Sequence, residues 1–113
     1  MGGLVAALLA AAALGGGGTA APSRATVVIR DYSYTPRTVT VHVGQPLQFV
    51  NRGKVEHTVA DVDAKGKLRS KLVKPRALAN GQSQVVRFAR PGLVHYVCTF
   101  HPTLMGGTVH VVG

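Results

Sequence analysis

The residues with the clearest potential for chemistry lie in one short segment near the C-terminus. Cys98 is the only cysteine of the chain, and His101 and Met105 follow it closely. A thiol, an imidazole and a thioether are all side chains that bind soft or borderline metal ions. A second imidazole, His57, begins a valine-rich run upstream. Because a single cysteine cannot form an internal disulfide, Cys98 is a free thiol, an intermolecular link or a metal ligand.

Two imidazoles, one thiolate and one weak axial thioether form the ligand set of a blue-copper (type 1) electron-transfer site. Zinc is less favoured, because methionine is a poor ligand for it. Without a metal, Cys98 would be an inert core thiol, His57 a strand-end histidine and Met105 core packing. The remaining histidines are expected at the surface: His42, His95 and His110.

The rest of the sequence gives little support for catalysis. It contains no nucleophile motif and no glycine-rich phosphate-binding loop, and its four acidic residues are too few to suggest paired-carboxylate chemistry. We therefore do not expect an enzyme.

Short strands must position the candidate ligands. Valine is abundant after residue 21, which favours strands over helices. Residues 37–43 alternate strictly, with Val39, Val41 and Val43 on one face and Thr38, Thr40 and His42 on the other. Further strands are expected at 25–31, 47–51, 57–62, 85–89, 93–99 and 108–112. This spacing predicts an all-β, antiparallel Greek-key sandwich of about seven to eight strands.

The N-terminal segment differs from the rest of the chain. Residues 4–14 are an apolar run, followed by four glycines and the small residues Thr19, Ala20 and Ala21. The run has the length of a signal-peptide core and is too short for a membrane span, which needs roughly 20 residues. It lacks the usual preceding Lys or Arg, and the alternative is an Ala/Gly tail or anchor. We expect residues 1–21 to be a cleaved signal peptide, residues 22–113 to form one domain, and the protein to be periplasmic or otherwise extracytoplasmic.

The charge is strongly positive. Thirteen Lys and Arg residues against four acids give a net charge of +9. Export makes nucleic acid an improbable partner, so the charge points to an acidic protein or, peripherally, to an anionic cell envelope. One segment without any acid holds six of the cations, and its alternative reading is a solvated loop: Lys65, Lys67, Arg69, Lys71, Lys74 and Arg76. We expect a monomer with redox protein partners.

The sequence after the signal segment resembles the small blue copper proteins of the cupredoxin family, most closely the amicyanin and plastocyanin group. The resemblance covers nearly all of residues 25–112. It rests on these motifs: Tyr34-x-Pro36-x-x-Val39-x-Val41-x-Val43-Gly44, Asn51 ahead of His57-Thr58-Val59, Gly92-x-x-x-Tyr96-x-Cys98-x-x-His101-Pro102, and Met105-x-Gly107-x-Val109-x-Val111.

The resemblance implies one copper ion held by four ligands: His57, Cys98, His101 and Met105. It implies a one-electron carrier between redox partners, with an apolar patch around His101. It also implies that Asn51 joins the two ligand loops through the backbone or hydroxyl of Thr99. Three residues separate His101 from Met105, between the two of amicyanin-like loops and the four of plastocyanin-like loops. Copper trafficking or storage, and a metal-free structural sandwich, are the alternatives.

Overall fold

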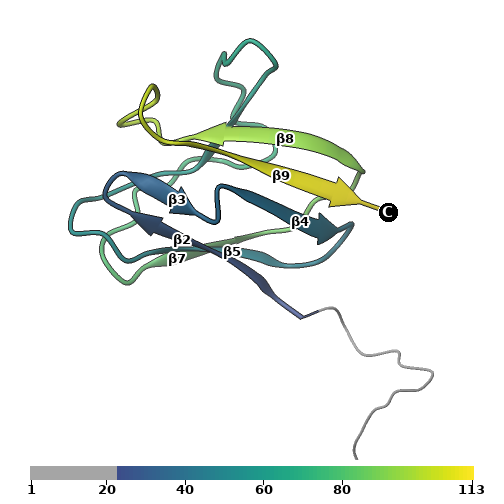
Figure 1. Ribbon diagram of the computed structural model, residues 1–113, viewed down its shortest axis with the longest axis horizontal. Coiled ribbons are helices and arrows are strands. Elements are labelled where there is room, and N and C mark those ends of the chain that lie inside the picture. The colour runs from purple at the N-terminus through teal and green to yellow at the C-terminus, as the bar shows by residue number, and fades with distance from the viewer. Residues whose placement is uncertain (1–22) are drawn as a thin grey trace, which may run out of the picture.

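The computed structural model describes residues 23–113, so the predicted signal segment 1–21 lies outside the described residues. The described chain forms eight strands in two four-stranded sheets (Figure 1). One sheet has the order β3-β2-β5-β7 and the other the order β4-β9-β8-β6. The bounds are β2 (Ala25–Arg30), β3 (Ser33–Thr35), β4 (Thr38–His42), β5 (Leu47–Asn51), β6 (Ala60–Val62), β7 (Ser83–Val86), β8 (Gly92–Val97) and β9 (Gly106–Val112). The predicted all-β sandwich is confirmed.

The strand directions differ in part from the prediction. β2 pairs with β5 in parallel, and β4 pairs with β9 in parallel, whereas the other neighbours are antiparallel. The expectation of antiparallel sheets is therefore wrong for these two pairs. Alternation reveals which side chains of a strand are buried, but carries no information about the direction of the strand beside it.

Strand positions follow the apolar pattern closely. In β4, Val41 is buried and Val39 half-buried, while the threonines and His42 are exposed, as predicted. Val43, predicted on the same face as these valines, follows the end of β4 and is exposed. The short strand β3 was not expected, β6 is shorter than the predicted run, and β7 begins two residues earlier. No helix in residues 23–113 is long and apolar enough to cross a membrane.

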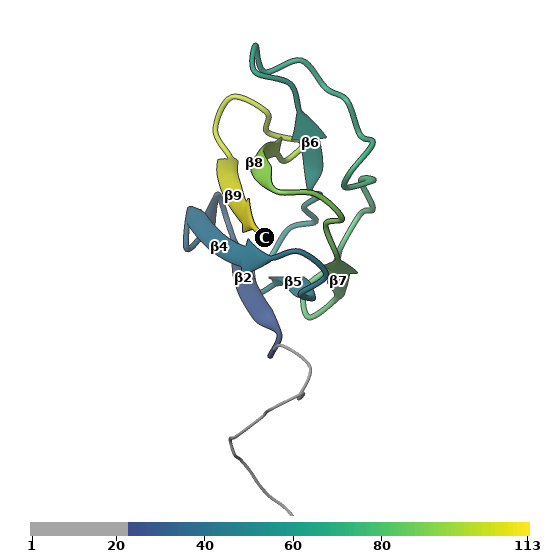
Figure 2. The same cartoon turned by 90° about the vertical axis from the view of Figure 1, so that its right-hand side faces the viewer.

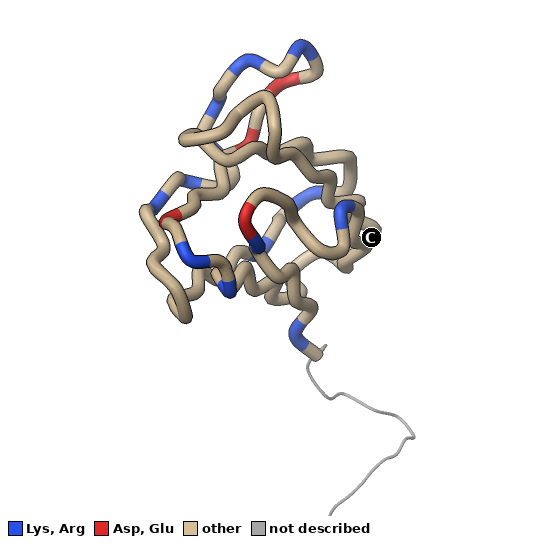
Figure 3. Tube along the Cα trace, turned by 60° about the vertical axis from the view of Figure 1, so that its left-hand side comes forward, with Lys and Arg blue, Asp and Glu red and all other residues tan. Residues whose placement is uncertain are grey.

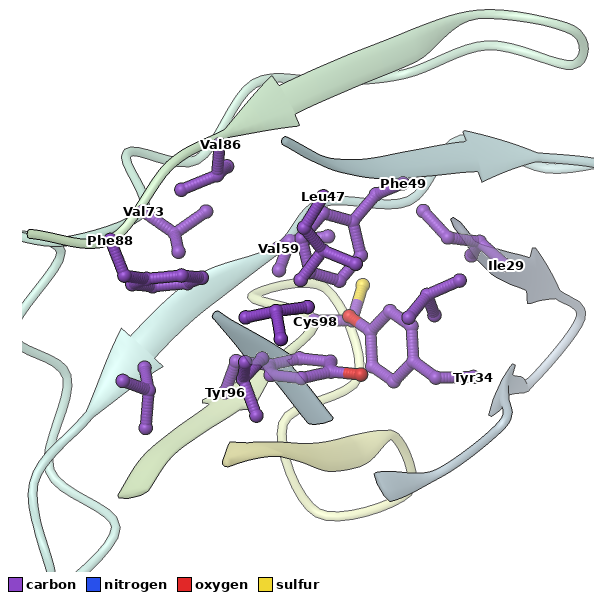
Figure 4. Packing of buried hydrophobic residues seen from close by; sticks show 14 of the residues in the cluster. Ile29, Tyr34, Leu47, Phe49, Val59, Val73, Val86, Phe88, Tyr96 and Cys98 are labelled. Carbon is purple, nitrogen blue, oxygen red and sulfur yellow. The ribbon is translucent and has the colours of Figure 1, made fainter. Parts of the chain in front are cut away.

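The core fills the space between the two sheets, which are seen as two layers in Figure 2. Its aromatic centre is Tyr96, whose ring meets those of Tyr34 and Phe49 edge to face at centroid distances of 4.8 and 5.3 Å. Such edge-to-face pairs add about 0.5–1.5 kcal/mol to the free energy gained by burial. Cys98 belongs to the same buried cluster as these rings (Figure 4).

Three connecting segments meet at the end of the sandwich drawn on the left of Figure 1. They are the β2–β3 turn, the segment that leaves β5, and the segment between β8 and β9. All the predicted ligands lie in the second and third of these segments. The sheets thus act as a frame that presents the candidate site on loops at one end.

Candidate metal centre

Cys98 follows directly after β8, and its side chain is completely buried. Main-chain hydrogen bonds fold the segment that begins at Cys98 back on itself. The N–H of Cys98 donates to the carbonyl of Met105 at 3.2 Å, and the N–H of Met105 donates to the carbonyl of His101 at 3.0 Å. These bonds hold the three candidate ligands of this segment in one compact turn. Met105 is 1% exposed, and His101 is half-buried at the surface.

His57 comes from the other ligand segment, between β5 and β6. Its backbone is fixed by a pair of hydrogen bonds with Leu78, at 3.1 and 2.9 Å, and its ring is fully buried. Nδ1 lies 3.8 Å from Sγ of Cys98. The ring centroid of His101 lies 5.6 Å from that of His57. Residues separated by about forty positions in the sequence therefore meet here, as predicted.

Thr58, next to His57, joins the two ligand segments. Its hydroxyl accepts a hydrogen bond from the N–H of Thr99 at 2.8 Å and lies 2.7 Å from the Thr99 hydroxyl. Its own N–H points to Sγ of Cys98 at 3.5 Å. On the other side, the hydroxyl of Tyr34 donates to the Thr58 carbonyl at 2.6 Å. Burial raises the pKa of Tyr34, with smaller contributions from Cys98 and Tyr96, so this donor stays neutral.

The role implied for Asn51 needs a correction. Asn51 is buried, but its amide group donates to the carbonyls of Val55 and Leu78, at 2.9 and 2.7 Å, and accepts from the N–H of Gly53. It therefore shapes the segment before His57, whereas Thr58 makes the link to Thr99. The amide group of Asn51 is occupied by its own loop, at Gly53 and Val55, and by the carbonyl of Leu78. The hydroxyl of Thr58 is the polar group that faces the cysteine segment.

Two contacts of the site were missed by sequence reasoning, and both come from the β2–β3 turn. Asp31 Oδ1 lies 2.6 Å from Nε2 of His57. The ring of Tyr32 meets the rings of both histidines edge to face, at 5.8 Å from His57 and 4.9 Å from His101. The hydrogen bond with His57 and that from the N–H of Lys54 lower the pKa of Asp31. No spacing pattern in the sequence links this turn to the ligands.

The donor set fits copper. A buried thiol and a buried thioether supply soft ligands, and two imidazoles supply ligands suited to both oxidation states. The side chains of Cys98 and His101 both lie close to the ring of His57, and Met105 is hydrogen-bonded to Cys98 and His101 through its main chain. Within residues 23–113, no three His, Cys, Asp or Glu side chains are close enough together to hold a metal ion as they stand. The remaining histidines, His42, His95 and His110, are exposed, as predicted.

Comparison with known protein families gives a clear result. The family described as copper binding proteins, plastocyanin/azurin family, matches residues 23–112. The chain belongs to this family. A search of curated protein sequences gave no significant match.

Solved structures agree with this assignment. A purple cupredoxin from Nitrosopumilus maritimus has a TM-score of 0.72 and 26% identity, and the match covers 77% of this chain and 98% of that one. A reduced amicyanin mutant has a TM-score of 0.67 and 29% identity, and the match covers 82% of this chain and 86% of the amicyanin chain. A copper-containing nitrite reductase from Thermus scotoductus, at 24% identity and TM-score 0.69, shares only the fold. That match covers 88% of this chain and 25% of the reductase.

These findings confirm the predicted cupredoxin family and copper as the cofactor. They support a copper protein of the electron-transfer type in general.

Proposed function

We propose that this cupredoxin is a one-electron carrier whose copper ligands are His57, Cys98, His101 and Met105. The observation that carries the proposal is the approach of His57 Nδ1 to Cys98 Sγ, at 3.8 Å, with His101 beside them at the surface. Cys98 would be the strong thiolate ligand, the two histidines the imidazole ligands and Met105 the weak axial one. When bound, copper supplies a one-electron couple between Cu(I) and Cu(II).

The burial of the ligands suits electron transfer better than substrate turnover. Cys98, His57 and Met105 are each at most 1% exposed, so they exclude water from the metal position. Only His101 is partly open to solvent. Around it, exposed apolar side chains offer a docking surface at which a partner can approach this imidazole: Tyr32, Phe100 and Leu104.

Redox titration tests this function. The copper-loaded protein should take up one electron per molecule, lose its visible absorption, and regain it on reoxidation without losing copper. Stopped-flow mixing with small redox proteins should show rapid exchange. Copper that binds tightly but is not reversibly reduced would contradict electron transfer, and would favour trafficking or storage instead.

Met105 is expected to set the reduction potential while the other three ligands retain copper. Met105→Leu should raise the potential, because an apolar neighbour favours the lower metal charge. Met105→Gln should lower it, because an amide oxygen favours the higher charge. Voltammetry measures both shifts, and Leu104→Ala, at an exposed neighbour, is the control that should leave the potential unchanged. Wild-type potentials in both Met105 variants would show that Met105 is core packing.

The basic loop, residues 63–76, is proposed as the docking surface for an acidic protein. Its six cations are exposed, and in Figure 3 several Lys and Arg residues lie along the loop that projects at the top of the molecule. Buried Asp61 anchors the loop, since its Oδ1 accepts the N–H groups of Leu72 and Val73 at 2.9 Å each. A loop held in this way presents its charges as a defined surface. The same charge would support peripheral contact with an anionic cell envelope.

Reversing the charges of this loop should slow association with an acidic redox partner. The test variant carries Lys65→Glu, Lys67→Glu and Lys71→Glu. Arg69 is left unchanged because its Nε lies 3.9 Å from Oδ2 of the buried Asp61. At low ionic strength the association rate constant of this variant should be roughly tenfold or more below that of the wild type. Added salt should bring the two rate constants closer together, because it screens the charges. Stopped-flow kinetics measures the rate.

The matched control reverses three exposed cations elsewhere, at Arg24, Arg37 and Arg87. Equal slowing in both variants would remove the docking role from the loop.

The N-terminal segment supports the further proposal that the monomeric domain 22–113 works outside the cytoplasm. The apolar run at 4–14, followed by small residues, is typical of a signal peptide. N-terminal sequencing of the protein recovered from the cell envelope fraction would locate the cleavage site. An intact N-terminus starting at Met1 would contradict cleavage.

A further inference from the structure

The β2–β3 turn forms a third side of the metal centre. Asp31 Oδ1 lies 2.6 Å from Nε2 of His57, and the two side chains are 22% and 0% exposed. On the next residue, the ring of Tyr32 packs against both histidines. The predicted ligand loops thus account for only part of the surroundings of His57. Its ring is held from the side opposite to Cys98 by a charged group.

We propose that Asp31 is a positioning residue that holds His57 in the tautomer and orientation needed for metal binding through Nδ1. The proposal rests on the assignment of His57 as a copper ligand in the proposed function. Asp31 itself does not contact Cys98 in this arrangement; it acts through the imidazole.

Hydrogen-bond chemistry decides the tautomer. A carboxylate only accepts hydrogen bonds, so Nε2 of His57 must carry the hydrogen that lies between it and Asp31. In a neutral imidazole, Nδ1 then has a free lone pair, and this atom is the one that faces Sγ of Cys98 at 3.8 Å. A carboxylate behind a ligating histidine also makes the ligand nitrogen more basic. Asp31 should therefore favour binding of Cu(II) more than binding of Cu(I).

The chain holds Asp31 firmly in this position. The N–H of Lys54 donates to Oδ2 at 2.7 Å, and the N–H of Val55 donates to Oδ1 at 3.3 Å. Gly53 provides the space, because a Cβ built on it would overlap the Asp31 carboxyl group. A side chain at position 53 would therefore push the carboxylate away from His57.

A purely structural role is the competing explanation, since Asp31 also holds the loop 53–55. Asp63 offers a matched control. Its Oδ1 likewise accepts two main-chain N–H groups, those of Lys65 and Lys67, at 2.9 and 2.8 Å. Asp63 lies in the basic loop, away from the ligand segments. Loss of Asp63 therefore removes a loop-holding carboxylate without touching His57.

The first measurement uses the copper-free protein and records ¹⁵N shifts of the His57 ring at alkaline pH, where a free imidazole is neutral. The wild type and Asp63→Ala should show hydrogen on Nε2 and a bare Nδ1. Asp31→Ala and Gly53→Ala should show a mixture of tautomers. Asp31→Asn keeps an acceptor oxygen and should restore much of the Nε2–H form. A wild-type ring that carries its hydrogen on Nδ1 would overturn the proposal.

The second measurement is copper affinity, determined by competition with a chelator for both oxidation states. Asp31→Ala should bind Cu(II) about 10- to 100-fold more weakly than the wild type, with a smaller loss for Cu(I), so its reduction potential should rise. The Cu(II) affinity of Asp31→Asn should lie between those of Asp31→Ala and the wild type. The affinity of Asp63→Ala should equal that of the wild type. Equal losses in Asp31→Ala and Asp63→Ala would show a loop-holding role and overturn the proposal.

The two measurements separate this inference from the proposed function. If the wild type binds no copper, the electron-carrier function fails, whereas the tautomer in the copper-free protein still reports whether Asp31 orients His57. If the wild type binds copper and exchanges electrons but the tautomer does not respond to Asp31, the function stands and the positioning role fails.

Discussion

Replacing Cys98 with serine is expected to abolish the visible absorption of the copper-loaded protein. The thiolate is the one ligand of the proposed set that can transfer charge to Cu(II) strongly in the visible range, and a hydroxyl group cannot replace it. Cys98 is also the only cysteine of the chain, so no other residue can take over this role. The wild type should show an intense band on addition of Cu(II), and Cys98→Ser should show none.

Absorption and electron paramagnetic resonance spectra of the two proteins measure the effect. His95→Ala is the control, because His95 is exposed and its ring faces Thr108 rather than the site. This variant should keep the full band. Circular dichroism checks that Cys98→Ser is folded, since the serine hydroxyl is placed in a buried position. A serine variant that remains coloured, or a wild type that gives only a pale tetragonal site, would refute the assignment.

Gly107→Ala is expected to cause the largest loss of stability among small substitutions in the sheets. Gly107 lies opposite Tyr96 in the β8–β9 pair, and a Cβ built on it would overlap the Tyr96 ring. That ring is 1% exposed and contacts Tyr34 and Phe49 in the core, so it has little room to move. Overpacking of this kind costs roughly 1–3 kcal/mol, and more where the neighbours cannot shift.

Urea denaturation measures the free energy of unfolding of this variant. The adjacent Gly106→Ala is the matched control, because its Cβ would meet only the carbonyl oxygen of Tyr96, at an ordinary contact distance of 3.5 Å. Because alanine lowers the conformational entropy of the unfolded chain, Gly106→Ala should be neutral or should raise the free energy of unfolding by about 0.4–1 kcal/mol. If both variants lose the same free energy, the fit between Gly107 and the Tyr96 ring does not control stability.

Tyr96 also connects this packing to the metal centre. It precedes Cys98 by two residues, so the two side chains share the inward face at the end of β8 (Figure 4). If Gly107→Ala displaces the Tyr96 ring, the packing around the Cys98 thiol should change as well. Copper affinity should therefore fall in this variant along with stability, whereas Gly106→Ala should leave both intact.

Local residue patterns were sufficient to predict the fold class and the metal. Alternation in 37–43 identified the buried face of β4, because the two faces of a strand differ in polarity only when one is buried. The residue types at positions 57, 98, 101 and 105 predicted copper, because few metals prefer that mixture of sulfur and imidazole, and the family match supports this metal. Both conclusions depend on local composition and spacing, which a linear sequence contains.

Side-chain orientation was decided only in three dimensions. Asn51 is buried, yet its amide group bonds to Val55, Gly53 and Leu78, and Thr58 makes the bond to Thr99. Both residues are short polar side chains near His57. Which of them faces the cysteine segment depends on the backbone path between β5 and β6, and no residue pattern specifies that path.

The contact between Asp31 and His57 depends on strand direction. β2 and β5 run parallel, with Ile29 opposite Asn51, so the chain that leaves β2 at Asp31 arrives beside Gly53. In an antiparallel pair, the end of β2 would lie beside the start of β5, far from the ligand loop. Alternation is the same for both directions. The parallel pairing of β2 and β5, which only the folded chain shows, therefore places Asp31 beside the ring of His57.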